Sequence, residues 1–135
     1  MGSSLVEKVW GDVFEHIDDD LRAVTRYDGL DHEMKLRDDV RTEYTRDEDR
    51  AIVDQAILSQ LSLDETEGAF KTGELESVIL AFEDAWILQW SDQLKTKSGL
   101  LISIQRNGER ASIADIEWCI EYLNEQIAPM TSDRQ

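Results

Sequence analysis

The chain has 135 residues, of which 41% are hydrophobic and 33% charged, and its 30 acidic and 14 basic residues give a net charge of −16. This length fits one compact domain with a real core. The hydrophobic fraction argues against intrinsic disorder. A surface this negative excludes general binding to nucleic acid and disfavours anionic membranes.

The acidic residues are spread along the chain rather than gathered in one stripe. They include Asp18–Asp20, Asp38–Asp39, Asp47–Asp49, Asp64–Glu67, Glu74–Glu76 and Glu121–Glu125. Spread acid with little lysine is typical of proteins from a high-salt cytoplasm, where salt screens the self-repulsion. A solvated halophilic surface is the preferred interpretation, and an acidic inhibitor that mimics nucleic acid is an alternative.

Cysteine content and apolar runs indicate the compartment. Cys119 is the only cysteine, so the chain forms no internal disulfide and no thiolate metal site. No apolar run approaches the roughly 20 residues that span a bilayer, and the N-terminus lacks a signal peptide. We expect a cytoplasmic protein without a membrane partner.

Two helices and a hairpin are predicted in the first half of the chain. Helical spacing of apolar residues predicts a helix over 4–20. Alternation then predicts two strands, 23–28 and 33–37, around the Asp28-Gly29 hairpin turn. A second helix begins near Thr45, which with Glu48 fits a capping box. Its apolar arc, through Leu61, is wide enough to be covered on more than one side.

The second half predicts three strands and a closing helix. Residues 62–74 read as a polar loop, followed by strands over 75–82, 86–90 and 100–104, with a loop over 91–99. Apolar residues on both faces indicate a sheet covered on both sides. Ser112 caps the last helix, which Pro129 ends. Its predicted inward stripe is Ile113, Ile116, Ile120, Leu123 and Ile127.

The predicted fold class is α+β: a single five-stranded antiparallel sheet with helices on both faces, in the order α-β-β-α-β-β-β-α. One domain covers 4–128, and 129–135 form a flexible tail.

This element order resembles the Roadblock family, the dynein light-chain type domain related to longin and profilin folds. The residues that carry the resemblance are the hairpin Tyr27-Asp28-Gly29-Leu30, the segment Leu75–Trp90 followed by Gly99–Ile104, and the closing amphipathic helix. The resemblance implies homodimers formed through the second helix and the edge of the third strand. It also implies a regulator of a small Ras-like GTPase. The family carries no catalytic motif.

No catalytic, metal or cofactor motif stands out. His16 and His32 have no ligand partner at i+4 and read as surface histidines. We therefore expect a non-enzymatic module, a homodimeric scaffold or regulator of a small GTPase or signalling protein in a halophilic cell. A small-ligand sensing domain of the profilin-like type is a second alternative.

Two surfaces are predicted to carry this function. The dimer interface is expected at Ile52, Val53, Ala56, Ile57, Val78, Ile79, Leu80 and Ala81. Trp118 and Tyr122 fall opposite the inward stripe of the last helix and suggest a partner patch rimmed by Glu121 and Glu125, because Trp and Tyr are enriched at binding hot spots. The alternative is that the two aromatics pack over the first helix, covering Val9 or Phe14.

Overall fold

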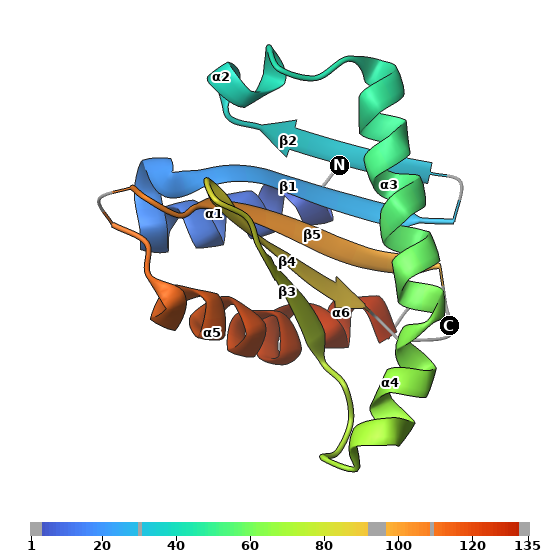
Figure 1. Ribbon diagram of the computed structural model, residues 1–135. Coiled ribbons are helices and arrows are strands. Elements are labelled where there is room, and N and C mark those ends of the chain that lie inside the picture. Colours follow the sequence, from blue (N-terminus) through green and yellow to red (C-terminus); the bar gives the residue numbers. More distant parts are fainter. Residues whose placement is uncertain (1–3, 30, 92–96, 109, 133–135) are drawn as a thin grey trace.

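Five antiparallel strands form one sheet in the order β2-β1-β5-β4-β3 (Figure 1). The computed structural model describes residues 4–29, 31–91, 97–108 and 110–132. The strands are β1 (Leu21–Asp28), β2 (Asp31–Leu36), β3 (Ser77–Ala81), β4 (Ala85–Ser91) and β5 (Ser98–Gln105). The helices are α1 (Leu5–Ile17), α2 (Asp38–Arg41), α3 (Arg46–Leu61), α4 (Leu63–Phe70), α5 (Ile113–Tyr122) and α6 (Ala128–Ser132). A 3-10 turn, Asp18–Asp20, follows α1, and a π-helical turn, Leu123–Ile127, joins α5 to α6. The predicted α+β class and element order are confirmed.

Helices α1 and α5 cover one face of the sheet, which we call the two-helix face. The main core lies here, where the apolar stripes of both helices meet alternate side chains of β4 and β5. It includes Val9, Val13, Leu88, Ile102, Ile116, Cys119, Leu123 and Ile127. Burial of this apolar surface is the principal stabilising contribution.

Helix α3 crosses the opposite face, which we call the α3 face (Figure 1). Thr45 and Glu48 form the predicted capping box at its start. Its inner side places Val53 and Ala56 on Tyr27 and Leu101. This second core is smaller than the first because a single helix covers the face.

Two predicted boundaries were wrong. The supposed loop 62–74 contains α4, because Asp64 and Glu65 favour a helix N-terminus and the segment's good helix formers outweigh the cost of Gly68. The supposed tail is helical through Ser132. Pro129 does not end the helix, since it lies in the first turn of α6, where a missing N–H costs little.

The stripe of the last helix also differs from prediction. Ile113, its first residue, is exposed, and burial begins one turn later at Ile116. Leu30, residues 92–96 of the predicted loop and residues 133–135 of the predicted tail lie outside the described residues.

Candidate functional site

Strand β3 is an edge of the sheet, and among the described residues its ladder partner is β4. Its side chains are apolar on both faces. Ile79 lies opposite Leu88 on the two-helix face and is 41% exposed, whereas Leu80 lies opposite Ile87 on the α3 face. The outer edge therefore presents exposed apolar side chains beside backbone groups that can pair with another strand.

The outward side of α3 also exposes apolar side chains. Leu58 is 65% exposed and Leu61 is also exposed, although both belong to the wide apolar arc of the helix. Phe70, at the end of α4, is 70% exposed. All three apolar side chains are accessible to another molecule, and such residues mark an interaction surface where they join in one patch.

The structure divides the eight residues predicted for the dimer interface. Ile52, Ile79, Leu80 and Ala81 are exposed, and Ile57 and Val78 are half-buried. Val53 and Ala56 were wrongly included, because they pack on the sheet of their own subunit and present no surface to a partner. Sequence reasoning did not single out Leu58, Leu61 and Phe70, which the structure leaves exposed. The wide arc of the helix could have indicated the first two, but Phe70 required the helix α4 to be recognised.

A groove opens on the α3 face, where α3 leaves β3 and β4 uncovered. This sheet groove has a volume of about 660 Å³. Ile87 and Leu101 form part of its floor, Ile52 lines it from α3, and Leu80 and Phe82 line it from the β3 side. Such dimensions and apolar walls are usual for sites that hold small molecules.

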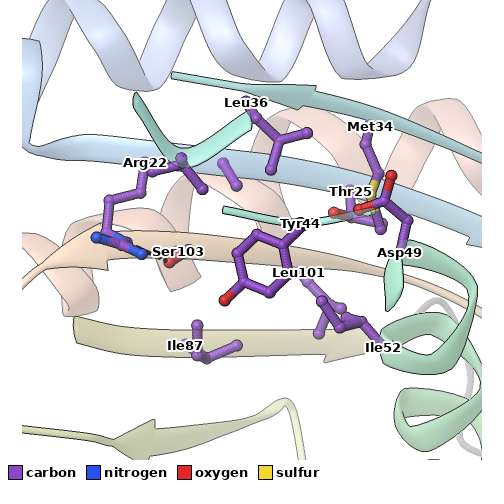
Figure 2. Close-up of a pocket in the computed structure, with 12 residues that line it drawn as sticks. Arg22, Thr25, Met34, Leu36, Tyr44, Asp49, Ile52, Ile87, Leu101 and Ser103 are labelled. Atoms are coloured by element: carbon purple, nitrogen blue, oxygen red, sulfur yellow. Dashed lines mark hydrogen bonds between the residues drawn. The ribbon is translucent and has the colours of Figure 1, made fainter. Parts of the chain in front are cut away.

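A smaller cavity of about 80 Å³ adjoins the groove and shares Arg22, Tyr44 and Ile52 with it. In Figure 2 the Tyr44 ring lies between Arg22 and Asp49. The Asp49 side chain is 3% exposed and accepts a 2.8 Å hydrogen bond from Arg41 at Oδ2. Its Oδ1 atom has no hydrogen-bond partner among the described residues. Although most of its walls are apolar, the cavity is large enough for a water molecule beside Asp49.

Arg22 reaches the groove because β1 carries an irregularity between Leu21 and Ala23 in its pairing with β5. Its side chain is 18% exposed, and its Nε donates a 3.3 Å hydrogen bond to the Ser103 hydroxyl. Its ion-pair partner among the described residues is Glu43, whose carboxylate lies 3.8 Å away, beyond hydrogen-bond distance.

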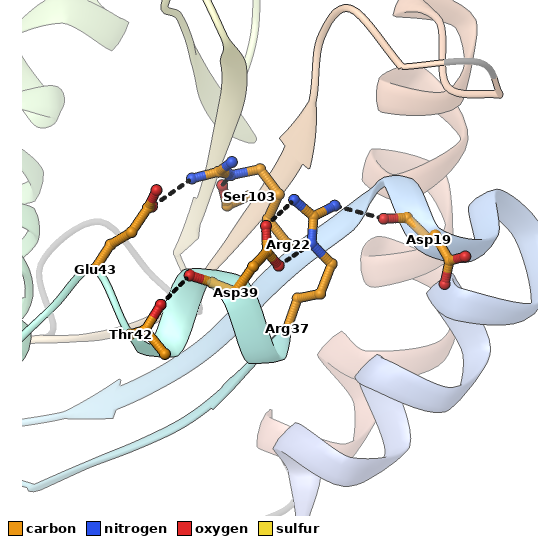
Figure 3. A network of polar contacts seen from close by, with 7 residues as sticks. All are labelled: Asp19, Arg22, Arg37, Asp39, Thr42, Glu43 and Ser103. Atoms are coloured by element: carbon orange, nitrogen blue, oxygen red, sulfur yellow. Dashed lines mark hydrogen bonds and ion pairs between the residues drawn. The ribbon is translucent and has the colours of Figure 1, made fainter.

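Arg37 provides a comparison within the same network (Figure 3). It donates hydrogen bonds of 2.6 and 3.0 Å to the Asp39 carboxylate and one of 2.6 Å to the Asp19 carbonyl. The hydrogen bonds from Arg37 lower the pKa of Asp39. The guanidinium of Arg37 is thus well satisfied, and that of Arg22 retains donors for another acceptor.

The predicted partner patch forms a packed aromatic stack between α1 and α5. Trp118 stacks on His16, with centroids 4.1 Å apart, and on Tyr122, at 5.3 Å. Tyr122 is buried and donates a 2.6 Å hydrogen bond to Asp12 of α1, which agrees with the alternative that the aromatics pack against the first helix. Helix α1 comes close enough to cover that side of α5. Glu121 and Glu125 remain exposed beside the stack.

The Cys119 thiol is not activated for nucleophilic chemistry. Burial raises the pKa of the Cys119 thiol to about 12, so the thiolate nucleophile does not form at neutral pH. The described residues hold no cluster of three or more His, Cys, Asp or Glu side chains suited to a metal ion. None of the helices described is both long and apolar enough to cross a membrane.

A comparison with protein families finds one that matches most of the chain. The family model described as "Domain of unknown function (DUF7522)" matches residues 7–128, from Glu7 in α1 to Ala128 at the start of α6. No curated protein matches the sequence.

Proposed function

This chain belongs to the DUF7522 family, and we propose that it acts as a homodimeric interaction module rather than as an enzyme. The observation that carries the proposal is the exposed apolar edge strand β3, with Ile79 and Leu80 uncovered on opposite faces. Pairing of two β3 edges would satisfy backbone groups and bury apolar side chains in one step.

The outward side of α3 and α4 supports the same assembly. Leu58 and Leu61 of α3 and Phe70 of α4 add exposed apolar area. A stable interface buries on the order of 1,600 Å² in total, more than a short strand supplies alone. We therefore assign the helices as well as the strand to the contact between subunits.

The partner and the cellular setting are inferred from the fold and from the net charge. The sheet order and the element order are compatible with a longin-like fold of the Roadblock type. On that resemblance the dimer serves as a scaffold or regulator of a small Ras-like GTPase or another signalling protein. The net charge of −16 supports a halophilic cytoplasm as its location.

Sedimentation equilibrium over a range of protein concentrations tests the homodimer. We expect a dimer for the wild-type protein and a monomer for Ile79→Asp, because the new carboxylate would be buried without a partner at the paired edge. Ile113→Asp is the matched control, since Ile113 is also exposed but belongs to α5. It should leave the dimer intact.

Two results would count against the proposal. A wild-type protein that stays monomeric at high concentration removes the homodimer altogether. A dimer that survives Ile79→Asp but dissociates with Leu58→Asp moves the interface from the strand to the helix. Circular dichroism of each variant confirms that the fold is retained.

A further inference from the structure

The sheet groove has the form of a ligand site independently of any dimer. Its volume of about 660 Å³ lies within the range of roughly 300–1,000 Å³ typical of small-molecule pockets. Ile52, Ile87, Leu101, Leu80 and Phe82 offer apolar contact along it. The occupant therefore needs an apolar body.

The polar end of the groove is set by Arg22 and Ser103. Arg22 is the only Lys or Arg that lines the groove among the residues described. Its contacts are the Ser103 hydroxyl at 3.3 Å and Glu43 at 3.8 Å. A guanidinium has five N–H donors in a planar fork that matches a carboxylate. Within the described part of the chain, only Nε of Arg22 donates a hydrogen bond, so the other donors can bind a carboxylate.

The other nearby arginines show what a satisfied guanidinium looks like in this protein. Arg37 holds Asp39 at 2.6 Å, and Arg41 holds Asp49 at 2.8 Å. Arg22 differs from both, because its 3.8 Å contact with Glu43 is too long for a hydrogen bond. Glu43 is 60% exposed, so it can turn into solvent when a ligand arrives.

We propose that the sheet groove binds a small amphipathic carboxylate. Its head group accepts hydrogen bonds from the Arg22 guanidinium and the Ser103 hydroxyl, and its apolar body lies over Ile87 and Leu101. Burial of the body supplies most of the affinity, and the charge-assisted hydrogen bonds to Arg22 fix the orientation.

The acidic residues around the groove narrow the ligand class. Glu83 and Asp84 also line it. Their charges, with the net −16 of the chain, oppose multiply charged anions such as phosphate esters. A ligand with one negative charge and a large apolar body is the best compromise between Arg22 and these carboxylates.

A cationic amphiphile is the main rival, because Asp49 has an oxygen without a partner among the described residues. However, Asp49 lines the smaller cavity rather than the groove, and Arg41 already neutralises its charge at 2.8 Å. A second cation there would be repelled by Arg41. Glu83 and Asp84, which line the groove itself, are exposed and screened by solvent, whereas the Arg22 side chain is only 18% exposed. The least-screened charge in the groove is therefore the Arg22 guanidinium, which favours the carboxylate.

Isothermal titration calorimetry with three probes of equal chain length tests the proposal: octanoate, octylammonium and octanol at constant ionic strength. We expect octanoate to bind at least about tenfold more tightly than either of the others. Arg22→Gln should weaken octanoate about tenfold or more, since it removes the anchoring charge. Arg46→Gln is the matched control, because Arg46 is exposed and lines neither cavity. The affinity of this variant for octanoate should stay within about twofold of wild type.

A measurement on the unmodified protein keeps the test decisive if Arg22→Gln does not fold. Octanoate should shift the methyl NMR signals of Ile87 and Leu101 and leave those of the two-helix core, such as Ile116, unchanged. Shifts confined to the core, or no binding of octanoate, would overturn the proposal. Equal or tighter binding of octylammonium would replace it with a cation site, and equal binding of octanol would remove the role of Arg22.

The ligand site and the homodimer can fail separately. Ile79 does not line the groove, so the Ile79→Asp protein should bind octanoate within about twofold of wild type whatever its oligomeric state. Loss of octanoate binding in that variant would overturn the assignment of the site to a single subunit.

Discussion

The Tyr27 hydroxyl donates a 2.7 Å hydrogen bond to the side-chain oxygen of Gln60 and thereby ties the end of α3 to β1. The same hydroxyl accepts a 3.3 Å hydrogen bond from Gln89. Gln89 in turn donates to the Ala56 carbonyl at 2.9 Å. This buried polar network fixes how α3 lies on its face, and the position of α3 sets one wall of the sheet groove.

Tyr27→Phe should therefore lower the free energy of unfolding by about 1–3 kcal/mol, because it removes hydrogen bonds from buried amides without creating a large cavity. Urea denaturation gives the value. Tyr44→Phe is the control, since the Tyr44 hydroxyl makes no hydrogen bond to the other residues described, and it should cost less than about 0.5 kcal/mol. Equal losses in both variants would contradict a specific role for the Tyr27 hydroxyl.

Gly99→Ala should lower the free energy of unfolding at least as much as Tyr27→Phe. A methyl group at this position of β5 would collide with the Trp90 carbonyl and the Tyr27 hydroxyl. Overpacking of this kind typically costs about 1–3 kcal/mol. Gly11→Ala provides the opposite control, because nothing lies within 4 Å of the new Cβ in α1. It should stabilise the protein by up to about 1 kcal/mol through helix propensity, and thermal melts of the two variants should move in opposite directions.

Trp118→Ala should lower stability by at least about 1 kcal/mol, since it removes the middle ring of the stack between His16 and Tyr122. Denaturation followed by circular dichroism measures the loss. Phe14→Ala is a milder comparison, because Phe14 makes one distant ring contact, 6.3 Å from Trp10. Unchanged stability with lost capture of a partner would instead restore the binding-patch interpretation.

Tyr122 predicts an alkaline limit to stability. Burial, followed by the hydrogen bond to Asp12, raises the pKa of Tyr122 well above its usual value. The unfolded chain releases the phenol proton near pH 10, whereas the folded protein retains it. Stability due to this group is therefore intact below pH about 10 and falls as the pH rises further. Urea unfolding across this range should show a steeper decline for wild type than for Tyr122→Phe, and parallel curves would contradict the assignment.

Salt should stabilise the fold, because a net charge of −16 creates repulsion between neighbouring carboxylates. Raising sodium chloride from low to molar concentration shortens the Debye length from roughly 10 Å at 0.1 M to about 3 Å. The melting temperature should rise over this interval. A flat response would remove halophilic adaptation as the explanation of the acidity.

Local sequence patterns determined most of the elements. The capping pairs Thr45 with Glu48 and Ser112 with Asp115 mark real helix starts, and Gly29 adopts the positive φ of 64° that the Asp28-Gly29 turn requires. These features depend on groups a few residues apart, so a short stretch of chain is sufficient to specify them. The sequence did not predict α4, because its few apolar residues form no stripe that the fold buries.

Contacts between distant segments decided the rest. Insertion of β5 between β1 and β4 builds the sheet, and its pairing with β1 carries the irregularity at Arg22. The wide apolar arc of α3 gave no indication of which side would face the sheet, so Val53 and Ala56 could not be separated from Leu58 beforehand. Likewise the groove exists because a single helix covers part of a five-stranded face. Apolar periodicity reports that a residue prefers burial, but only the packed chain decides what buries it.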